Sequence, residues 1–160
     1  MFKINNSDFI KLFENETTLS KVGKIDIEVI EDDSYESLYY KFPLVERLVL
    51  EIYKCVPGTN IEMYEQGTMK TINSIINNNS SFDLLPEDLL CKINKYFNEN
   101  DNSPRNKLFH TLGEEYFEVI VDFNEINYII AQLLALLTHI SNEFTLSTLK
   151  KIDKIEFKNF

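Results

Sequence analysis

The chain of 160 residues contains no tryptophan, only four glycines, four prolines and two cysteines. So little glycine and proline argues against the many tight turns of a β-sandwich or small barrel, and favours helices. Cys55 and Cys91 are too few for a disulfide framework, and the first residues lack the basic and then apolar run of a signal peptide. We therefore expect a cytoplasmic protein with reduced thiols.

Long apolar runs are also missing. The most apolar stretch, Ile129 to Leu137, is too short to cross a bilayer and includes Gln132, so we interpret it as a buried helix and expect no membrane association. The hydrophobic content of 44% and the charged content of 26% are typical of a globular chain. The length fits one domain with a real core.

Positive charge is scarce, because 16 Lys and Arg stand against 26 Asp and Glu and leave a net charge of −10. Proteins that bind nucleic acid mainly through electrostatics neutralise phosphates with clustered cations, so any RNA contact in this chain must be local. The same charge suits an acidic protein that neutralises a basic partner.

Apolar residues at helical spacing predict an all-α fold from Tyr35 onward. The first long helix follows Asp33 and Ser34, and Pro43 either starts a new helix or kinks this one. Further helices are expected around 69–76, around 86–97 and after Ser103 and Pro104. Residues 124–144 form the clearest predicted helix, and a last one is expected around 146–152.

The first 34 residues are expected to form an N-terminal extension that packs on a single helical domain comprising residues 35–160. Asp8 to Phe13 resembles a short capped helix, followed by a polar link to Gly23. The run from Ile25 to Ile30 alternates apolar and polar residues, which is typical of an edge strand or of an extended arm over the bundle.

One short segment contains three residues that could take part in catalysis: Arg105, Asn106 and His110. The whole sequence has only two arginines and two histidines. In a helix that begins at Pro104, Asn106 and His110 are four residues apart and share a face. A guanidinium and the free amides of a helix start offer donors to a phosphate, and an imidazole can move protons near neutral pH. These groups suit RNA cleavage, in which the RNA supplies its own 2′-OH nucleophile.

The motif Arg105-Asn106-x-x-x-His110, set before a long apolar helix, resembles the HEPN superfamily of helical ribonucleases and nucleotide-binding domains. The segment from Phe42 to Ile52 also resembles the first long helix of several members, and the likeness extends over roughly residues 35–141. The resemblance implies a HEPN-like helical bundle that forms a homodimer and cleaves single-stranded RNA without a metal or other cofactor.

The same resemblance implies a role for each residue of the motif. Arg105 would bind the scissile phosphate, His110 would transfer protons, and Asn106 would orient His110 or the phosphate. Glu46 would set the arginine or the opposing helix. The predicted activity is that of an endoribonuclease of prokaryotic toxin or antiviral-defence type, with an antitoxin or regulatory partner as a further expectation.

Two other functions remain open at this point: a HEPN-like module that binds RNA or a nucleotide without cutting it, and an acidic immunity or antitoxin protein that binds a basic toxin. Simpler interpretations of the residues also stand. Arg105 pairs with Glu99 or Asp101 on the surface, Glu46 is an ordinary solvated residue, and His139 lies at the edge of the core.

The remaining polar and aromatic residues give no site of their own. Two cysteines and two histidines at scattered positions give no metal-ligand spacing, so we expect no metal site. The tyrosines Tyr35, Tyr39 and Tyr53 recur at helical spacing and are interpreted as core residues rather than as a base-stacking platform.

Overall fold

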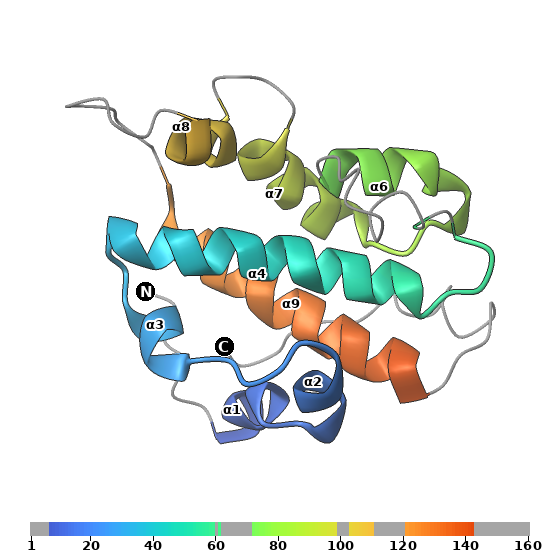
Figure 1. Cartoon of the computed structure of the whole chain (residues 1–160), viewed down its shortest axis with the longest axis horizontal. Helices are drawn as coiled ribbons and strands as arrows, with labels where there is room; N and C mark the ends of the chain where they lie inside the picture. Colours follow the sequence, from blue (N-terminus) through green and yellow to red (C-terminus); the bar gives the residue numbers. More distant parts are fainter. Residues whose placement is uncertain (1–6, 60, 62–71, 99–102, 111–120, 143–160) are drawn as a thin grey trace.

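A computed structural model of the chain describes residues 7–59, 61, 72–98, 103–110 and 121–142. These residues are mostly helical and contain no strand, which confirms the all-α class (Figure 1). In chain order, the elements are α1 (Ser7–Phe13), α2 (Glu16–Lys21), α3 (Ile27–Glu31), α4 (Tyr35–Lys54), α6 (Ile72–Asn78), the short 3-10 helix η1 (Ser80–Phe82), α7 (Glu87–Phe97), α8 (Pro104–His110) and α9 (Phe123–Asn142).

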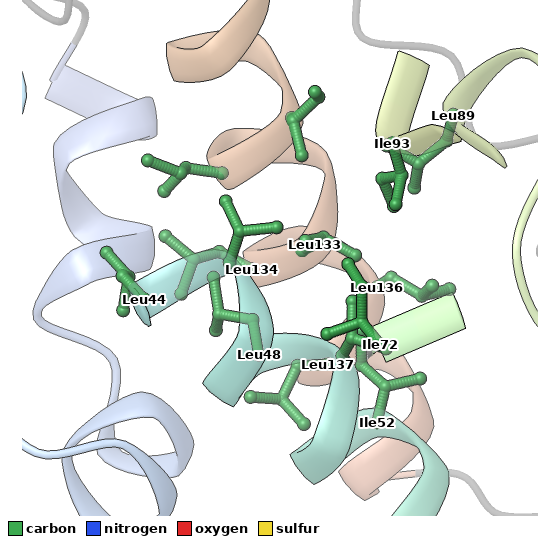
Figure 2. Close-up of a cluster of buried hydrophobic side chains, with 14 of the residues drawn as sticks. Leu44, Leu48, Ile52, Ile72, Leu89, Ile93, Leu133, Leu134, Leu136 and Leu137 are labelled. Carbon is green, nitrogen blue, oxygen red and sulfur yellow. The ribbon is translucent and has the colours of Figure 1, made fainter. Parts of the chain in front are cut away.

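The two longest helices, α4 and α9, lie side by side and make the most extensive contact in the described structure. Figure 2 shows Leu48 and Ile52 of α4 next to Leu133, Leu134 and Leu137 of α9. All of these side chains are buried. The stretch from 129 to 137 is therefore a buried helix, as its composition predicts. No helix in the described ranges is long and apolar enough to span a bilayer.

Shorter helices cover this central pair from two sides (Figure 1). On one side α1 and α2 contact α9, and α3 contacts α4; on the other, α6 packs on α4 while α7 packs on α9 and also contacts α6 and α8. Phe13, Ile25 and Ile30, from the first 34 residues, belong to the same buried apolar cluster as α4 and α9. The N-terminal helices therefore contribute directly to the core.

The prediction of a strand or extended arm from Ile25 to Ile30 is wrong, because helix α3 occupies most of these residues. The side chain of Asp26 caps the helix by accepting hydrogen bonds from the backbone amides of Glu28 and Val29, at 3.0 and 3.4 Å. The backbone amide of Asp26 is itself held by the hydroxyl of Tyr40 at 2.9 Å. This single helical turn buries the side chain of Ile30 completely. In the same way, α2 occupies part of the segment before Gly23 that was expected to be a polar link.

Pro43 lies inside the continuous helix α4 and starts no new helix. Proline cannot donate the backbone hydrogen bond to the carbonyl four residues earlier, which belongs to Tyr39. Pro43 is exposed, while its neighbours Phe42 and Leu44 are buried. Burial of the flanking residues therefore holds the helix together across the missing bond. The expected helix around 146–152, and the end of the one expected over 124–144, lie outside the described residues.

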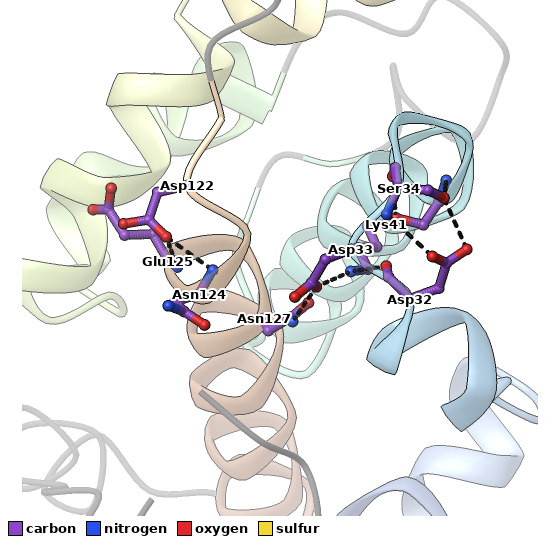
Figure 3. Close-up of polar contacts among 9 residues, drawn as sticks. Asp32, Asp33, Ser34, Lys41, Asp122, Asn124, Glu125 and Asn127 are labelled. Atoms are coloured by element: carbon purple, nitrogen blue, oxygen red, sulfur yellow. Dashed lines mark hydrogen bonds and ion pairs between the residues drawn. The ribbon is translucent and has the colours of Figure 1, made fainter. Parts of the chain in front are cut away.

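A buried cation joins α4 to the start of α9. Lys41 is fully buried, and its Nζ donates to the backbone carbonyl of Asp32 at 2.7 Å and to Oδ1 of Asp33 at 3.4 Å (Figure 3). The amide of Asn127 donates to the same Asp33 oxygen, and the ammonium lies 5.2 Å from the centre of the Phe123 ring. Burial lowers the pKa of Lys41, and the Asp33 carboxylate partly opposes that shift.

Replacing Lys41 tests whether this cation is held in the core. Because its pKa is lowered on folding, the folded chain binds fewer protons than the unfolded chain between that lowered pKa and the ordinary value of 10.5. The free energy of unfolding therefore rises with pH across this interval. The measurement is the free energy of unfolding in urea at a series of pH values up to 10.5. We expect the Lys41→Met variant to lack the part of the rise with pH that Lys41 causes. If the free energy of unfolding rises equally with pH in both proteins, the assignment is contradicted.

The partner residue should be less tolerant of change than the lysine itself. Asp33→Ala leaves the buried ammonium without its carboxylate, and we expect a loss of about 2 kcal/mol in the free energy of unfolding at neutral pH. Lys41→Met replaces the cation with an apolar chain of similar length and should cost within about 1 kcal/mol. Equal losses in the two variants would show that the ion pair contributes nothing specific.

Candidate functional site

The motif helix α8 begins at Pro104, where the sequence predicts it. Ser103 is buried and caps the first turn, because its Oγ accepts a hydrogen bond from the backbone amide of Asn106 at 3.3 Å and its carbonyl accepts one from Lys107 at 2.9 Å. Pro104 lacks an amide at a position where a helix start leaves amides unbonded in any case. The cap thereby fixes the residues on either side of Arg105.

Three neighbours hold the guanidinium of Arg105. Its Nε donates to Oε1 of Glu46 at 2.7 Å, and its Nη1 donates to Oδ1 of Asn106 at 3.5 Å. The guanidinium carbon lies 4.9 Å from the centre of the Phe109 ring, in a cation–π contact. Within the described residues these contacts leave Nη2 for a further acceptor, such as an oxygen of a bound anion.

The structure thus brings Glu46 next to Arg105 and Asn106, which lie far from it in the sequence. The side chains of Arg105 and Glu46 are each 22% exposed, and Asn106 is 8% exposed. Glu46 is therefore a partner of Arg105 rather than an ordinary solvated residue. The competing partners Glu99 and Asp101 lie outside the described residues.

His110 is the last residue of α8, one helical turn after Asn106. Its side chain lies outside the described part of the structure. The hydroxyl of Tyr39 donates to the carbonyl of Leu108 at 3.5 Å, so the last turn of α8 lies beside the first half of α4. Since Arg105 pairs with Glu46, further along α4, the two helices run antiparallel.

Two of the three tyrosines interpreted as core residues are exposed. Tyr35 is 53% exposed and Tyr39 is 40% exposed, whereas Tyr53 is buried as expected. The ring of Tyr39 packs edge to face with Phe109, with centroids 5.6 Å apart, and Tyr35 packs in the same way with Phe123 at 6.3 Å. Helical spacing places these rings on one face of α4 but does not show how far neighbouring elements cover that face.

His139 was expected at the edge of the core and is instead exposed on α9. The preceding turn of that helix is buried, and Thr138 is half-buried, so the apolar face passes just beside His139. The histidine therefore contributes nothing to the motif and serves as a comparison residue for His110 in experiments.

Sequence reasoning missed a pocket of about 530 Å³ at the start of α9, which is lined by both polar and apolar side chains. There, Oε1 of Glu125 accepts hydrogen bonds from Nζ of Lys95 at 2.6 Å and from the hydroxyl of Tyr96 at 2.8 Å. The bond from Lys95 lowers the pKa of Glu125, and burial raises that of Tyr96. Asp122 caps α9 by accepting from the amide of Asn124 at 2.9 Å. These groups satisfy one another, so the pocket makes a weaker case for a site than the motif.

Within the described ranges, no three His, Cys, Asp or Glu side chains gather closely enough to hold a metal ion. Comparisons with protein-family models, curated proteins and solved structures find no match for this chain. Membership of the HEPN superfamily therefore remains a prediction that rests on the motif of Arg105, Asn106 and His110.

The pairing of Glu46 with Arg105 can be tested by a double-mutant cycle. We expect Glu46→Ala and Arg105→Ala, alone and combined, to give a coupling energy of about 1 kcal/mol in urea unfolding, because both side chains are mostly buried. The matched control is Asp88 with Lys92, a pair four residues apart on α7 in which Asp88 is 72% exposed. Its coupling should stay below about 0.5 kcal/mol. Equal coupling in both cycles would argue against a specially held arginine.

Proposed function

We propose that the chain is a metal-independent endoribonuclease of HEPN type that cleaves single-stranded RNA as a homodimer. The observation that carries the proposal is the restraint of Arg105 by Glu46, Asn106 and Phe109 at the surface of the motif helix. A guanidinium fixed in this way, with donor capacity to spare, suits a phosphate whose negative charge grows in the transition state.

The reaction needs a base, an acid and a cation. The 2′-OH of one nucleotide loses its proton to the base and forms a bond to the adjacent phosphorus. The bond from phosphorus to the 5′-oxygen breaks, and that oxygen takes a proton from the acid, which leaves a cyclic phosphate. In the proposal the His110 residues of the two protomers carry these protons, and Arg105 stabilises the charge on the phosphate oxygens.

Asn106 and Glu46 position the reacting groups in this scheme. Asn106 is buried and contacts Arg105, so it limits where the guanidinium can turn. Glu46 forms an ion pair with Arg105 and so holds the guanidinium in position before RNA binds. With a net charge of −10, the chain would contact RNA only locally, at this arginine. An activity of this kind fits a prokaryotic toxin or antiviral-defence protein, with an antitoxin or regulatory partner that restrains it.

The first test is incubation of the purified protein with labelled single-stranded RNA in EDTA. We expect the native protein to cut the RNA, and we expect Arg105→Ala and His110→Ala each to reduce the rate by about 100-fold or more. The matched controls are Arg47→Ala, which changes a half-exposed arginine one residue from Glu46, and His139→Ala, which changes an exposed histidine. Both controls should retain the native rate.

Other outcomes separate the alternatives. Full activity in both motif variants would overturn the assignment of the site. Binding of RNA without cleavage by the native protein would select the non-catalytic RNA-binding module. Neither binding nor cleavage would favour the acidic immunity or antitoxin protein, for which the net charge of −10 is the supporting observation.

A further inference from the structure

Exposed aromatic rings continue the motif along the surface of α4. At 100° per residue, Tyr35, Tyr39 and Glu46 fall within about 40° of one another around the helix axis. Because α8 runs antiparallel to α4, Arg105 lies beside Glu46, and Phe109 lies beside Tyr39. Tyr35, Tyr39, Phe109 and Arg105 thus form a continuous row, here called the aromatic stripe.

The exposure of the stripe is unusual for this chain. Among the described residues only three large hydrophobic side chains are exposed, and two of them are Tyr35 and Tyr39. The third, Leu19, lies on α2, away from α4 and α8, and lines a separate pocket. Both tyrosines use part of a ring in edge-to-face contacts and still leave about half of their surface open to solvent. Two such rings beside a restrained arginine supply the stacking part of a single-strand binding surface.

We infer that unpaired bases of a single-stranded RNA stack on Tyr35 and Tyr39, and that this stacking sets the adjacent phosphate at Arg105. The inference rests on the proposed function and adds to it the residues that bind and position the substrate. Tyr39, in the middle of the stripe, lies at the last described turn of α8, which includes His110. Bases held there lie next to the phosphate that is cut.

The size of the stripe favours RNA over a second copy of the chain. The two tyrosines together expose roughly 200 Å² of surface, whereas a stable protein interface needs about 800 Å² from each partner. An area of that size matches the faces of a few bases. The stripe alone is therefore too small to hold a homodimer together, and the dimer in the proposed function must use additional surface.

The charge of the chain determines what kind of affinity for RNA is open to it. With a net charge of −10 and one arginine at the site, overall electrostatics oppose RNA binding, so the affinity must come from contacts that do not depend on charge. Stacking is nearly independent of charge and is sequence-tolerant, since every base has an aromatic face. The aromatic stripe therefore supplies affinity that an acidic protein lacks. Its signature is weak dependence on salt, with a slope of about −0.7 in log K against log salt for one phosphate contact.

The test measures binding of a labelled single-stranded RNA that carries 2′-O-methyl groups and so cannot be cut. We expect Tyr35→Leu and Tyr39→Leu each to weaken binding by about tenfold without changing the salt slope. Tyr35→Phe and Tyr39→Phe, which keep the ring, should bind within about twofold of the native protein. Leu19→Ser is the matched control for an exposed apolar residue away from the stripe and should bind normally.

A second readout reports stacking directly. The chain has eight tyrosines and no tryptophan, so its ultraviolet emission comes from tyrosine. Stacked bases should quench part of this emission on binding, and the Tyr35→Leu and Tyr39→Leu variants should lose part of that quenching. Because about half of each side chain is exposed, the unfolding midpoints of these variants should stay close to that of the native protein, which separates a binding defect from misfolding.

The outcomes distinguish this inference from the proposed function. If the native protein cuts RNA while both leucine variants bind and quench normally, the stripe is not the substrate surface and the nuclease stands. If the native protein neither cuts nor binds RNA, both are overturned. If the leucine variants lose dimerisation in sedimentation and the phenylalanine variants do not, the stripe is a protein interface, and the inference fails.

Discussion

The apolar contact between α4 and α9 is the constraint on which the rest of the structure depends. Leu48 and Ile52 on one helix and Leu133 and Leu137 on the other are buried, and each such side chain contributes about 2 kcal/mol when it leaves water. This contact fixes the rotation of α4 about its own axis. One face of α4 is committed to α9, and residues beside that face are left to contact α3, α6 and α8.

The motif lies at the margin of this core, where the described residues of α8 contact α4. Its first turn covers Glu46, and its last turn reaches Tyr39. Without this contact Glu46 would lie in solvent, where its pairing with Arg105 would be weak. The partly buried ion pair and the contact of Tyr39 with Phe109 both lie along this junction of the two helices.

Helices with clear spacing and caps were predictable from the sequence. Ser103 and Pro104 marked the start of α8, and the apolar spacing after residue 123 marked α9. The five residues of α3 were not predictable, since one turn is too short to show a helical period. In this segment the hydrogen bonds accepted by the Asp26 side chain favour a helix, whereas the alternation of apolar and polar residues wrongly predicts a strand.

Contacts between distant residues were the other limit. Arg105 and Glu46 are 59 positions apart, so no local pattern joins them, and Glu46 was singled out only through the resemblance to a family. The exposure of Tyr35 and Tyr39 depends on the elements that pack beside α4, which helical spacing in α4 does not encode. Spacing assigns a residue to a face of a helix, and the neighbouring element decides whether that face is covered.

The most direct measurement of the central claim, that RNA meets this chain along α4 and α8 beside Arg105, is a map of backbone amide shifts in an NMR titration with uncleavable single-stranded RNA. The account predicts shifts concentrated in the first three turns of α4 and along α8, with α2 unchanged. Shifts confined to α1 and α2, or the absence of shifts at an RNA concentration that saturates binding in solution, would contradict it.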